Sequence, residues 1–429
     1  MKKTASAIGS IEKIVRNAKN ARKAESEIAH LGTAEKNAIL EDIASDLLKR
    51  MDEIQRANQK DVRAAKSLSS EMPAMPAMID RLTLNEKRIR EMAAGLRELV
   101  RLPDPVGHVV TSYKRPNGLK ISKVRIPLGV VAIIYESRPN VTIDAAALCL
   151  KSGNAVILRG GSEAIHSNIF LGKIIQGVLK KHKVSPHVVQ VIDTPDREAM
   201  KHLVKQSASI DLIIPRGGTS LMRWIEEHAK IPVLKHDKGV CHVFVDASAN
   251  PSMAEEIVFN AKVQRPGVCN ALETLLVHEK IAPTFLPRVA KRLSGAGVEI
   301  RGDLKTRKIL PEAKKAVEED WSTEYLDLKL SVKVVPDLEG AVSHIRKYGS
   351  LHTEAIVTEN SKIAEAFLNR LDSSVVLWNA STRFNDGGQL GLGAEIGIST
   401  SKLHAFGPMG LDELTTTKFV VRGTGQVRG

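Results

Sequence analysis

One cysteine of the chain stands where its thiol could act as a nucleophile. Cys269 lies in the segment Gln264-Arg265-Pro266-Gly267-Val268-Cys269-Asn270-Ala271, in which Pro266-Gly267 predicts a tight turn. A thiol on such a loop lies close to backbone N–H groups. Lys262 and Arg265 add positive charge, which favours the thiolate, the form that attacks carbonyl carbon. From the residues alone, a small buried structural cysteine stays an equal alternative.

The other two cysteines favour a structural interpretation. Cys149 and Cys241 sit in apolar surroundings without a comparable loop, so we expect both to be inert core residues. Three cysteines without metal-ligand spacing form neither a disulfide framework nor a metal centre, so we expect no bound metal. Such sparse cysteine use is typical of a reducing compartment.

Two glycine-containing turns could bind anions. The first, Arg159-Gly160-Gly161-Ser162-Glu163, follows an apolar run typical of a strand, and the second, Pro215-Arg216-Gly217-Gly218-Thr219-Ser220, precedes a helical segment. Small residues there let a phosphate approach the N-terminus of a helix. Each turn alone is more often a plain βα connection, and the G-x-G-x-x-G fingerprint is absent. Together they indicate a dinucleotide crevice.

The elements around these turns alternate between strands and helices. Short runs rich in Val and Ile occur at 129–135, 155–158, 188–192, 210–214 and 242–245, with helical segments at 164–180 and 220–230. This rhythm predicts right-handed crossovers and a mostly parallel, doubly wound sheet. A second α/β unit is expected from about residue 249, with a helix over 252–263 that leads to Cys269.

The first 126 residues have a different pattern. Apolar residues at helical spacing predict helices, one of which is expected to begin at Thr83, with Thr83 and Glu86 as a capping box. Alternating runs on either side of Asn117-Gly118 predict a β-hairpin over 108–126, and another strand is expected near 418–421. Because an isolated hairpin is marginally stable in water, we expect it to pack against another subunit or another part of the sheet.

Composition and charge limit the function classes. With 429 residues, 43% of them hydrophobic, two or more globular domains are expected. The net charge of +14 could indicate a nucleic-acid scaffold, but no basic run is interleaved with aromatic residues, and we expect scattered surface charge and no nucleic-acid partner. No segment reads as a signal peptide or a membrane span, so we expect a cytosolic protein without membrane contact.

Longer stretches resemble a known family. The Cys269 segment, Pro127-Leu128-Gly129-Val130 and Ser152-Gly153-Asn154 are similar to the aldehyde dehydrogenase superfamily. Within it, nearly the whole chain resembles the gamma-glutamyl phosphate reductase (glutamate-5-semialdehyde dehydrogenase) family. The stretches that carry this resemblance are Tyr135–Val141, Val240–Val243, Val335–Ile356 (with His344, His352, Thr353 and Glu354), Asn379–Phe384 and Gly391–Glu395.

The resemblance implies an activity and a set of residues. It implies NADPH-dependent reduction of L-glutamate 5-phosphate to L-glutamate 5-semialdehyde and phosphate, the second step of proline biosynthesis, through a thioester on Cys269. It also implies a Rossmann-type cofactor domain, an α/β catalytic domain and a β-hairpin oligomerisation arm. The implied catalytic residues are Cys269 and Asn270, whose neighbouring backbone N–H groups would form the oxyanion hole. The residues implied for NADP(H) are Arg159, which suits a 2′-phosphate, and Ser162, Glu163, Gly217, Gly218, Thr219 and Glu324. The residues implied for the substrate are Arg138, Asn140 and Arg383.

The expected domain layout follows the same resemblance. Residues 1–107 and 126–248 would form the cofactor domain, with 380–408 returning to it, residues 249–379 the catalytic domain, and residues 108–125 and 409–429 the arm. A homodimer or a dimer of dimers is expected. A glutamate 5-kinase is a possible partner that would hand over the labile acyl phosphate.

The sequence departs from its relatives at two places. Hydrolytic members of the superfamily carry a Glu-Leu-Gly-Gly glutamate that activates water, whereas residues 234–239 read Leu-Lys-His-Asp-Lys-Gly. The absence of this glutamate fits a reductase, because attack by water would convert the thioester to glutamate. A hydrolytic NAD(P)-dependent aldehyde dehydrogenase stays the alternative. The second departure is Phe406, where most relatives are expected to have arginine.

Overall fold

The structure is a computed structural model that describes residues 2–67, 75–235 and 238–428. The chain divides into two compact units, of which the first comprises residues up to 235 with 391–397 and 409 onward, and the second residues 236–390 and 398–408. Within the described ranges, no helix is long and apolar enough to cross a membrane. Each unit is built around its own parallel sheet.

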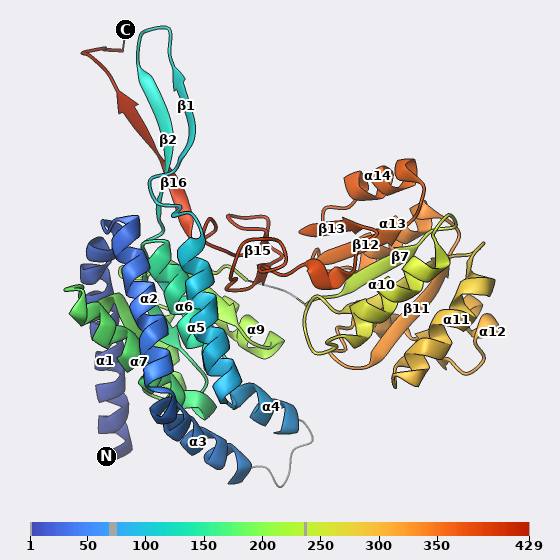
Figure 1. Ribbon diagram of the computed structural model, residues 1–429, viewed down its shortest axis with the longest axis horizontal. Helices are drawn as coiled ribbons and strands as arrows, with labels where there is room; N and C mark the ends of the chain where they lie inside the picture. Colours follow the sequence, from blue (N-terminus) through green and yellow to red (C-terminus); the bar gives the residue numbers. More distant parts are fainter. Residues whose placement is uncertain (1, 68–74, 236–237, 429) are drawn as a thin grey trace. The chain divides into compact units, whose positions relative to one another are not determined.

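The first unit contains a four-stranded parallel sheet of order β5-β4-β3-β6. Its strands are β3 (Val130–Tyr135), β4 (Ala155–Arg159), β5 (Val189–Val191) and β6 (Leu212–Arg216). Every residue of β3 is buried, because helices flank the parallel sheet (Figure 1). The helices of this unit are α1 (Lys2–Ala29), α2 (Thr33–Lys49), α3 (Met51–Ser67), α4 (Met75–Leu82), α5 (Glu86–Arg101), α6 (Asn140–Lys151), α7 (Ile165–Lys181), α8 (Arg197–Leu203) and α9 (Thr219–His228).

The predicted start of α5 is wrong by three residues. The helix begins at Glu86, and the side chain of Asn85 caps it by accepting a hydrogen bond from the Arg88 N–H (2.9 Å). The Thr83 hydroxyl instead donates to the Ile79 carbonyl (2.7 Å), at the end of α4. Asparagine and threonine are both good caps, so residue type alone did not distinguish between them.

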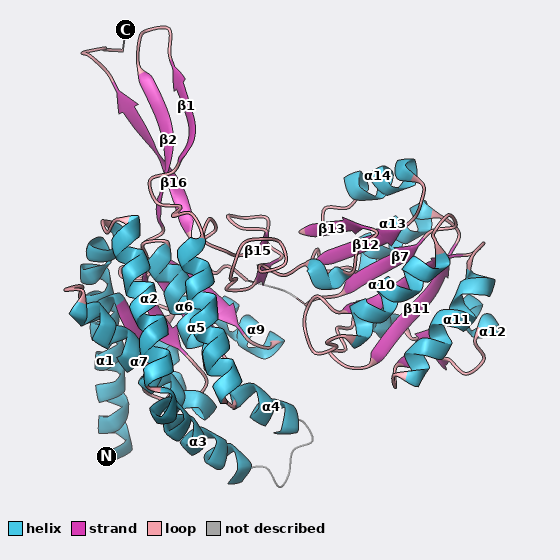
Figure 2. Ribbon diagram, in the orientation of Figure 1, coloured by secondary structure: helices cyan, strands magenta, loops and turns pink. Residues whose placement is uncertain are grey.

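A separate antiparallel sheet extends from the helices of the first unit (Figure 2). Strand β2 (Lys120–Pro127) pairs on one side with β1 (Val109–Lys114) and on the other with β16 (Thr415–Arg422). The hairpin predicted around Asn117-Gly118 is confirmed, and Gly118 has the positive φ (+92°) that such a turn requires. Several apolar side chains are exposed on this sheet, among them Phe419 (62%) and Val421 (54%). We call the three strands the arm.

The second unit contains a seven-stranded parallel sheet of order β10-β9-β11-β8-β7-β12-β13. Its strands are β7 (Cys241–Val245), β8 (Leu272–His278), β9 (Glu299–Gly302), β10 (Lys314–Lys315), β11 (Lys329–Val335), β12 (Thr353–Val357) and β13 (Val375–Trp378), and its helices are α10 (Pro251–Val263), α11 (Ala282–Gly295), α12 (Leu304–Ile309), α13 (Leu338–Tyr348) and α14 (Ser361–Arg370). Helices α10 and α11 form one apolar core with the sheet, and α13 and α14 form another. Leu275 and Val277 of β8 face the first of these cores and Leu276 between them faces the second, as the strand period of two requires.

The expected domain boundary at residue 248 differs from the boundary in the structure. Strand β7 was placed in the first sheet, but it pairs with β8 and β12 in the middle of the second sheet. The chain therefore changes units near residue 235. The expected return of 380–408 to the first unit holds only for 391–397, because β14 (Ile398–Ser399) and β15 (Gly407–Pro408) pair within the second unit. Phe406 lies there with the Lys402 Nζ 6.0 Å from the centre of its ring.

Candidate active site

Cys269 lies on the loop between α10 and β8, as its sequence context predicts. The cysteine is partly exposed, and Asn270 beside it is buried. The Ala271 N–H donates to the Val268 carbonyl (3.1 Å), which closes a turn around Cys269. A partly exposed thiol on a fixed turn is accessible to a substrate and lies close to backbone donors.

A second loop holds Asn270 from the carboxyl side of β13. The Asn270 Nδ2 donates to the Asn385 carbonyl (2.8 Å), and the Arg383 Nη1 donates to the Asn270 Oδ1. The Thr382 hydroxyl donates to the Asn270 carbonyl (2.7 Å). The Asn270 side chain is therefore engaged within the protein, and the predicted oxyanion-hole role of the neighbouring backbone N–H groups stays a prediction.

Arg383, a predicted substrate residue, is brought to the nucleophile loop. Its Nε donates to the Gln264 Oε1 (2.8 Å), at the start of that loop. Burial, and next the positive charge of Arg265, lower the pKa of Arg383 from its ordinary value. A partly buried arginine with a second positive charge near it favours the binding of an anion.

Lys262 does not supply the positive charge that the sequence predicted for the thiol. Its Nζ lies 2.7 Å from the Glu273 Oε2, and both side chains are fully buried. Burial lowers the pKa of Lys262 and raises the pKa of Glu273 to about 7. The lysine charge is thus neutralised locally, because a buried lysine needs a buried carboxylate as a partner.

Glu324, the residue predicted to bind the nicotinamide ribose, is connected to the nucleophile loop through Gly239. Its Oε1 accepts a hydrogen bond from the Gly239 N–H (2.9 Å), and burial raises its pKa. Gly239 packs directly on Cys269, because a Cβ at Gly239 would lie 2.0 Å from the Cys269 carbonyl oxygen. Only glycine fits at that position without displacing the nucleophile loop.

The sequence interpretation missed Cys241. It was expected to be an inert core cysteine, and it is indeed fully buried, but its Sγ lies 3.1 Å from the Cys269 carbonyl oxygen. The parallel pairing of β7 with β8 brings the two segments together. The family-like stretch Val240–Val243 was the one signal in the sequence that marked this position.

Most of the predicted cofactor residues lie at one edge of the first sheet. The register pairs Ile134 with Arg159 and Tyr135 with Arg216, so β3, β4 and β6 all end at this edge. In an open parallel sheet, ligands bind outside the carboxyl ends of the strands. Arg159 is the last residue of β4 and lies at this edge.

The carboxylate of Glu163 has a specific partner at this edge. Its Oε1 accepts hydrogen bonds from the Ser137 N–H (2.6 Å) and from the Ser137 hydroxyl (2.7 Å). A Cβ at Gly161 would lie 2.1 Å from the Glu163 Oε1, so the glycine leaves room for the carboxylate to fold back. Ser162, which precedes Glu163, is exposed.

The second anion-binding turn already holds an anionic oxygen. The Gly218 N–H, at the N-terminus of α9, donates to the Glu136 Oε2 (3.2 Å). A Cβ at Gly217 would lie 2.7 Å from the Glu136 carboxyl carbon, whereas a Cβ at Gly218 would meet nothing within 4 Å. Thr219 is the first residue of α9, and its side chain lies outside the described part of the chain.

The remaining predicted substrate residues lie in the first unit. Asn140 is the first residue of α6, and its Nδ2 donates to the Asp144 Oδ2 (2.9 Å). Burial raises the pKa of Asp144 to about 6. The Arg138 carbonyl accepts from the Val141 N–H (3.0 Å). Because these residues belong to the first unit and Arg383 to the second, their joint role stays a prediction.

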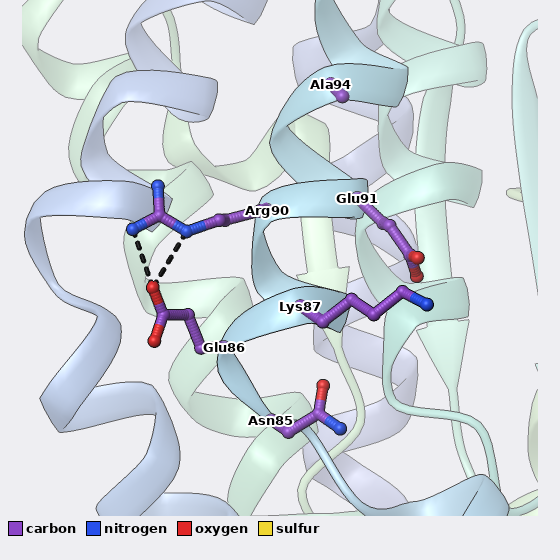
Figure 3. A pocket seen from close by; sticks show the side chains of 6 residues that line it. All are labelled: Asn85, Glu86, Lys87, Arg90, Glu91 and Ala94. Carbon is purple, nitrogen blue, oxygen red and sulfur yellow. Dashed lines mark hydrogen bonds and ion pairs between the residues drawn. The ribbon is translucent and has the colours of Figure 1, made fainter.

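A pocket on α5 does not belong to this site (Figure 3). It is lined by Asn85, Glu86, Lys87, Arg90, Glu91 and Ala94. All six residues come from one helix and its cap, and Arg90 is paired with Glu86 (2.7 Å). A surface formed by a single helix lacks the converging groups that a substrate site needs.

Comparison with known proteins is consistent with this geometry. The family model "Aldehyde dehydrogenase family" matches residues 4–307. The chain is similar to a gamma-glutamyl phosphate reductase of Geobacter metallireducens, with 58% identity over 97% of this chain and 99% of that protein. It is also similar to one of Desulforapulum autotrophicum, with 58% identity over 96% of this chain and 97% of that protein.

Solved structures give the same result. The crystal structure of gamma-glutamyl phosphate reductase from Thermotoga maritima matches with a TM-score of 0.94 and 46% identity, over 97% of this chain and all of that chain. An acetylating aldehyde dehydrogenase from Geobacillus thermoglucosidasius matches with a TM-score of 0.70 at 17% identity, over 99% of both chains, which shows a shared fold.

Proposed function

The chain belongs to the gamma-glutamyl phosphate reductases of the aldehyde dehydrogenase family, and on that premise we propose that it reduces L-glutamate 5-phosphate to L-glutamate 5-semialdehyde with NADPH, releasing phosphate. This reaction is a step of proline biosynthesis. The observation that carries the proposal is the partly exposed Cys269 on its fixed turn, with the cations Arg265 and Arg383 near it.

The residues at the edge of the first sheet fit a nicotinamide dinucleotide. The Gly218 N–H already donates a hydrogen bond to an anionic group, the Glu136 carboxylate, and the space beside Gly218 is open. Gly217, Gly218 and Thr219 would hold the pyrophosphate, and Arg159, Ser162 and Glu163 the adenosine ribose with its 2′-phosphate. Glu324, a residue of the second unit, is the one proposed for the nicotinamide ribose. When bound, the nicotinamide supplies the hydride that reduces the thioester.

The protein groups perform the acyl chemistry. The Cys269 thiolate attacks the acyl carbon of the substrate, and the N–H groups of the loop stabilise the oxyanion, an interaction worth about 3–4 kcal/mol of barrier for each donor. The acyl–oxygen bond to phosphate then breaks, which leaves a thioester on Cys269. After reduction, the carbon–sulfur bond breaks, the aldehyde leaves and the thiolate is restored.

Basic residues would hold the two anionic ends of the substrate. We assign Arg383 to one of them, since it lies against the nucleophile loop and its pKa is lowered by burial and by Arg265. Arg138 and Asn140 are the candidates from the first unit. A glutamate 5-kinase is the proposed supplier of the labile acyl phosphate, and free thiols at all three cysteines fit a cytosolic enzyme.

Arg159→Ala is expected to weaken NADPH binding about 10- to 100-fold and NADH binding much less. A charged hydrogen bond to the 2′-phosphate contributes roughly 1.5–3 kcal/mol, and NADH lacks that phosphate. The measurement is the dissociation constant of each cofactor by isothermal titration calorimetry without substrate, with NADH as the internal control. An equal loss for both cofactors would contradict the assignment of Arg159.

The arm is proposed to join subunits. Phe419 and Val421 lie two residues apart on β16, so they share one face of the arm, and both are largely exposed. Exposed apolar residues on a projecting sheet favour contact with a second copy of the chain.

A double change to Phe419→Asp and Val421→Asp is therefore expected to lower the molar mass measured by light scattering to that of one chain. The intact protein is expected to be a dimer or a dimer of dimers. Lys418→Asp, on the opposite face of β16, is the control that should keep the assembly. A monomeric intact protein would disprove the role of the arm.

A further inference from the structure

A second cysteine contacts the main chain of the nucleophile. Cys241 is the first residue of β7, next to β8 in the sheet of the second unit, and its side chain is fully buried. Its Sγ lies 3.1 Å from the Cys269 carbonyl oxygen and 3.6 Å from the Nδ1 of His352. Gly239 packs on the same carbonyl group.

The direction of this hydrogen bond is fixed by chemistry. Burial, and next the negative charge of Glu354, raise the pKa of Cys241 well above its ordinary value, so the side chain stays a thiol. A carbonyl oxygen has no hydrogen to give, so the thiol is the donor. His352 is itself held by the Thr353 hydroxyl (2.6 Å), which places its ring beside Cys241.

The bond sets the orientation of one peptide group. In a trans peptide, the C=O and the following N–H point in opposite directions. The Cys269 carbonyl points into the interior toward Cys241, so the Asn270 N–H points away from the interior. The next carbonyl is held as well, because Asn270 accepts from the Thr382 hydroxyl.

We propose that Cys241 is a positioning residue: its thiol holds the Cys269–Asn270 peptide in the orientation that directs the Asn270 N–H toward the acyl oxygen of a substrate attacked by Cys269. This role rests on the proposed function, in which that oxygen becomes an oxyanion. Without the thiol, the peptide can rotate, and the donor is no longer preorganised.

The test compares two variants of Cys241 with a matched control. Cys241→Ala removes the donor, and Cys241→Ser keeps a donor of similar size. Cys149→Ala removes an equally buried thiol from α6 in the first unit, so it reports the cost of a small cavity without a contact to the nucleophile loop.

We expect Cys241→Ala to lower kcat about tenfold or more, at unchanged KM for glutamate 5-phosphate and unchanged dissociation constant for NADPH. Cys241→Ser should keep kcat within about threefold, since its hydroxyl also donates to a carbonyl. Cys149→Ala should keep kcat within about twofold. A wild-type kcat in Cys241→Ala, a loss of equal size in Cys149→Ala, or a serine variant as slow as the alanine variant would each overturn the proposal.

A spectroscopic readout separates this proposal from the proposed reaction. The S–H stretching band that Raman difference spectra assign to Cys241 should lie at lower frequency than the band of Cys149, because donation to a carbonyl weakens the S–H bond. Equal frequencies would remove the hydrogen bond on which the proposal stands. The two proposals can therefore fail separately. If the intact protein did not turn over glutamate 5-phosphate but the S–H band of Cys241 were still shifted, the proposed reaction would be wrong and the hydrogen bond of Cys241 would stand.

Discussion

Replacing Cys269 by alanine is expected to lower kcat by at least ~10⁴-fold, because no other described group on the nucleophile loop can form the thioester. Cofactor binding should persist, since the residues assigned to the 2′-phosphate and pyrophosphate lie in the first unit. The measurements are NADPH oxidation with glutamate 5-phosphate and calorimetric titration of NADPH.

Serine at position 269 tests the same step more strictly. A hydroxyl is a much weaker nucleophile than a thiolate at neutral pH, so Cys269→Ser should be almost as inactive as the alanine variant. Cys149→Ala is the control for general loss of a thiol. Turnover near the wild-type rate in the serine variant would exclude the covalent mechanism.

The second large effect is the dependence of the reverse reaction, aldehyde oxidation, on phosphate. Oxidation of glutamate semialdehyde with NADP is expected to fall about 100-fold or more in phosphate-free buffer, because water then has to attack the thioester without a general base. Residues 234–239 lack the glutamate of the hydrolytic enzymes. Glu273 is bonded to Lys262, and Glu324 to the Gly239 N–H.

The measurement is the rate of NADP reduction with phosphate, with arsenate and with neither anion. Arsenate is expected to restore the rate, since it attacks the thioester as phosphate does. Free glutamate formed at the full rate without either anion would instead support the hydrolytic aldehyde dehydrogenase alternative.

Much of the fold could be predicted from local sequence patterns. The apolar runs predicted β3 and β4, and the helix before Cys269 was predicted to within one residue of α10. These elements are buried, so the spacing of their apolar residues indicates the type of element. The partner of each strand is not encoded in this way, because a run of Val and Ile has the same pattern in either parallel sheet. For that reason β7 was placed in the wrong unit.

In the candidate site, too, local features could be predicted from the sequence and tertiary contacts could not. The loop chemistry of Cys269 was readable from Pro266 and Gly267, since a turn is a local property. The contact of Cys241 with Cys269 depends on the pairing of β7 with β8, and the neutralisation of Lys262 depends on the position of Glu273 across from α10. Such pairwise relations come from tertiary structure and leave no pattern in the segments themselves.

The order in which the two units can fold follows from the last strand of the arm. Strand β16 pairs with β2 along its whole length, and the Arg125 side chain bonds to Thr415, 290 residues further along the chain. The sheet of the second unit, in contrast, is complete once β13 has been made at residue 378. During synthesis, the second unit can therefore close while the first still lacks an edge of its arm. The arm is thus completed only after every strand of the second unit's sheet has been made, although its first two strands lie before that unit in the sequence.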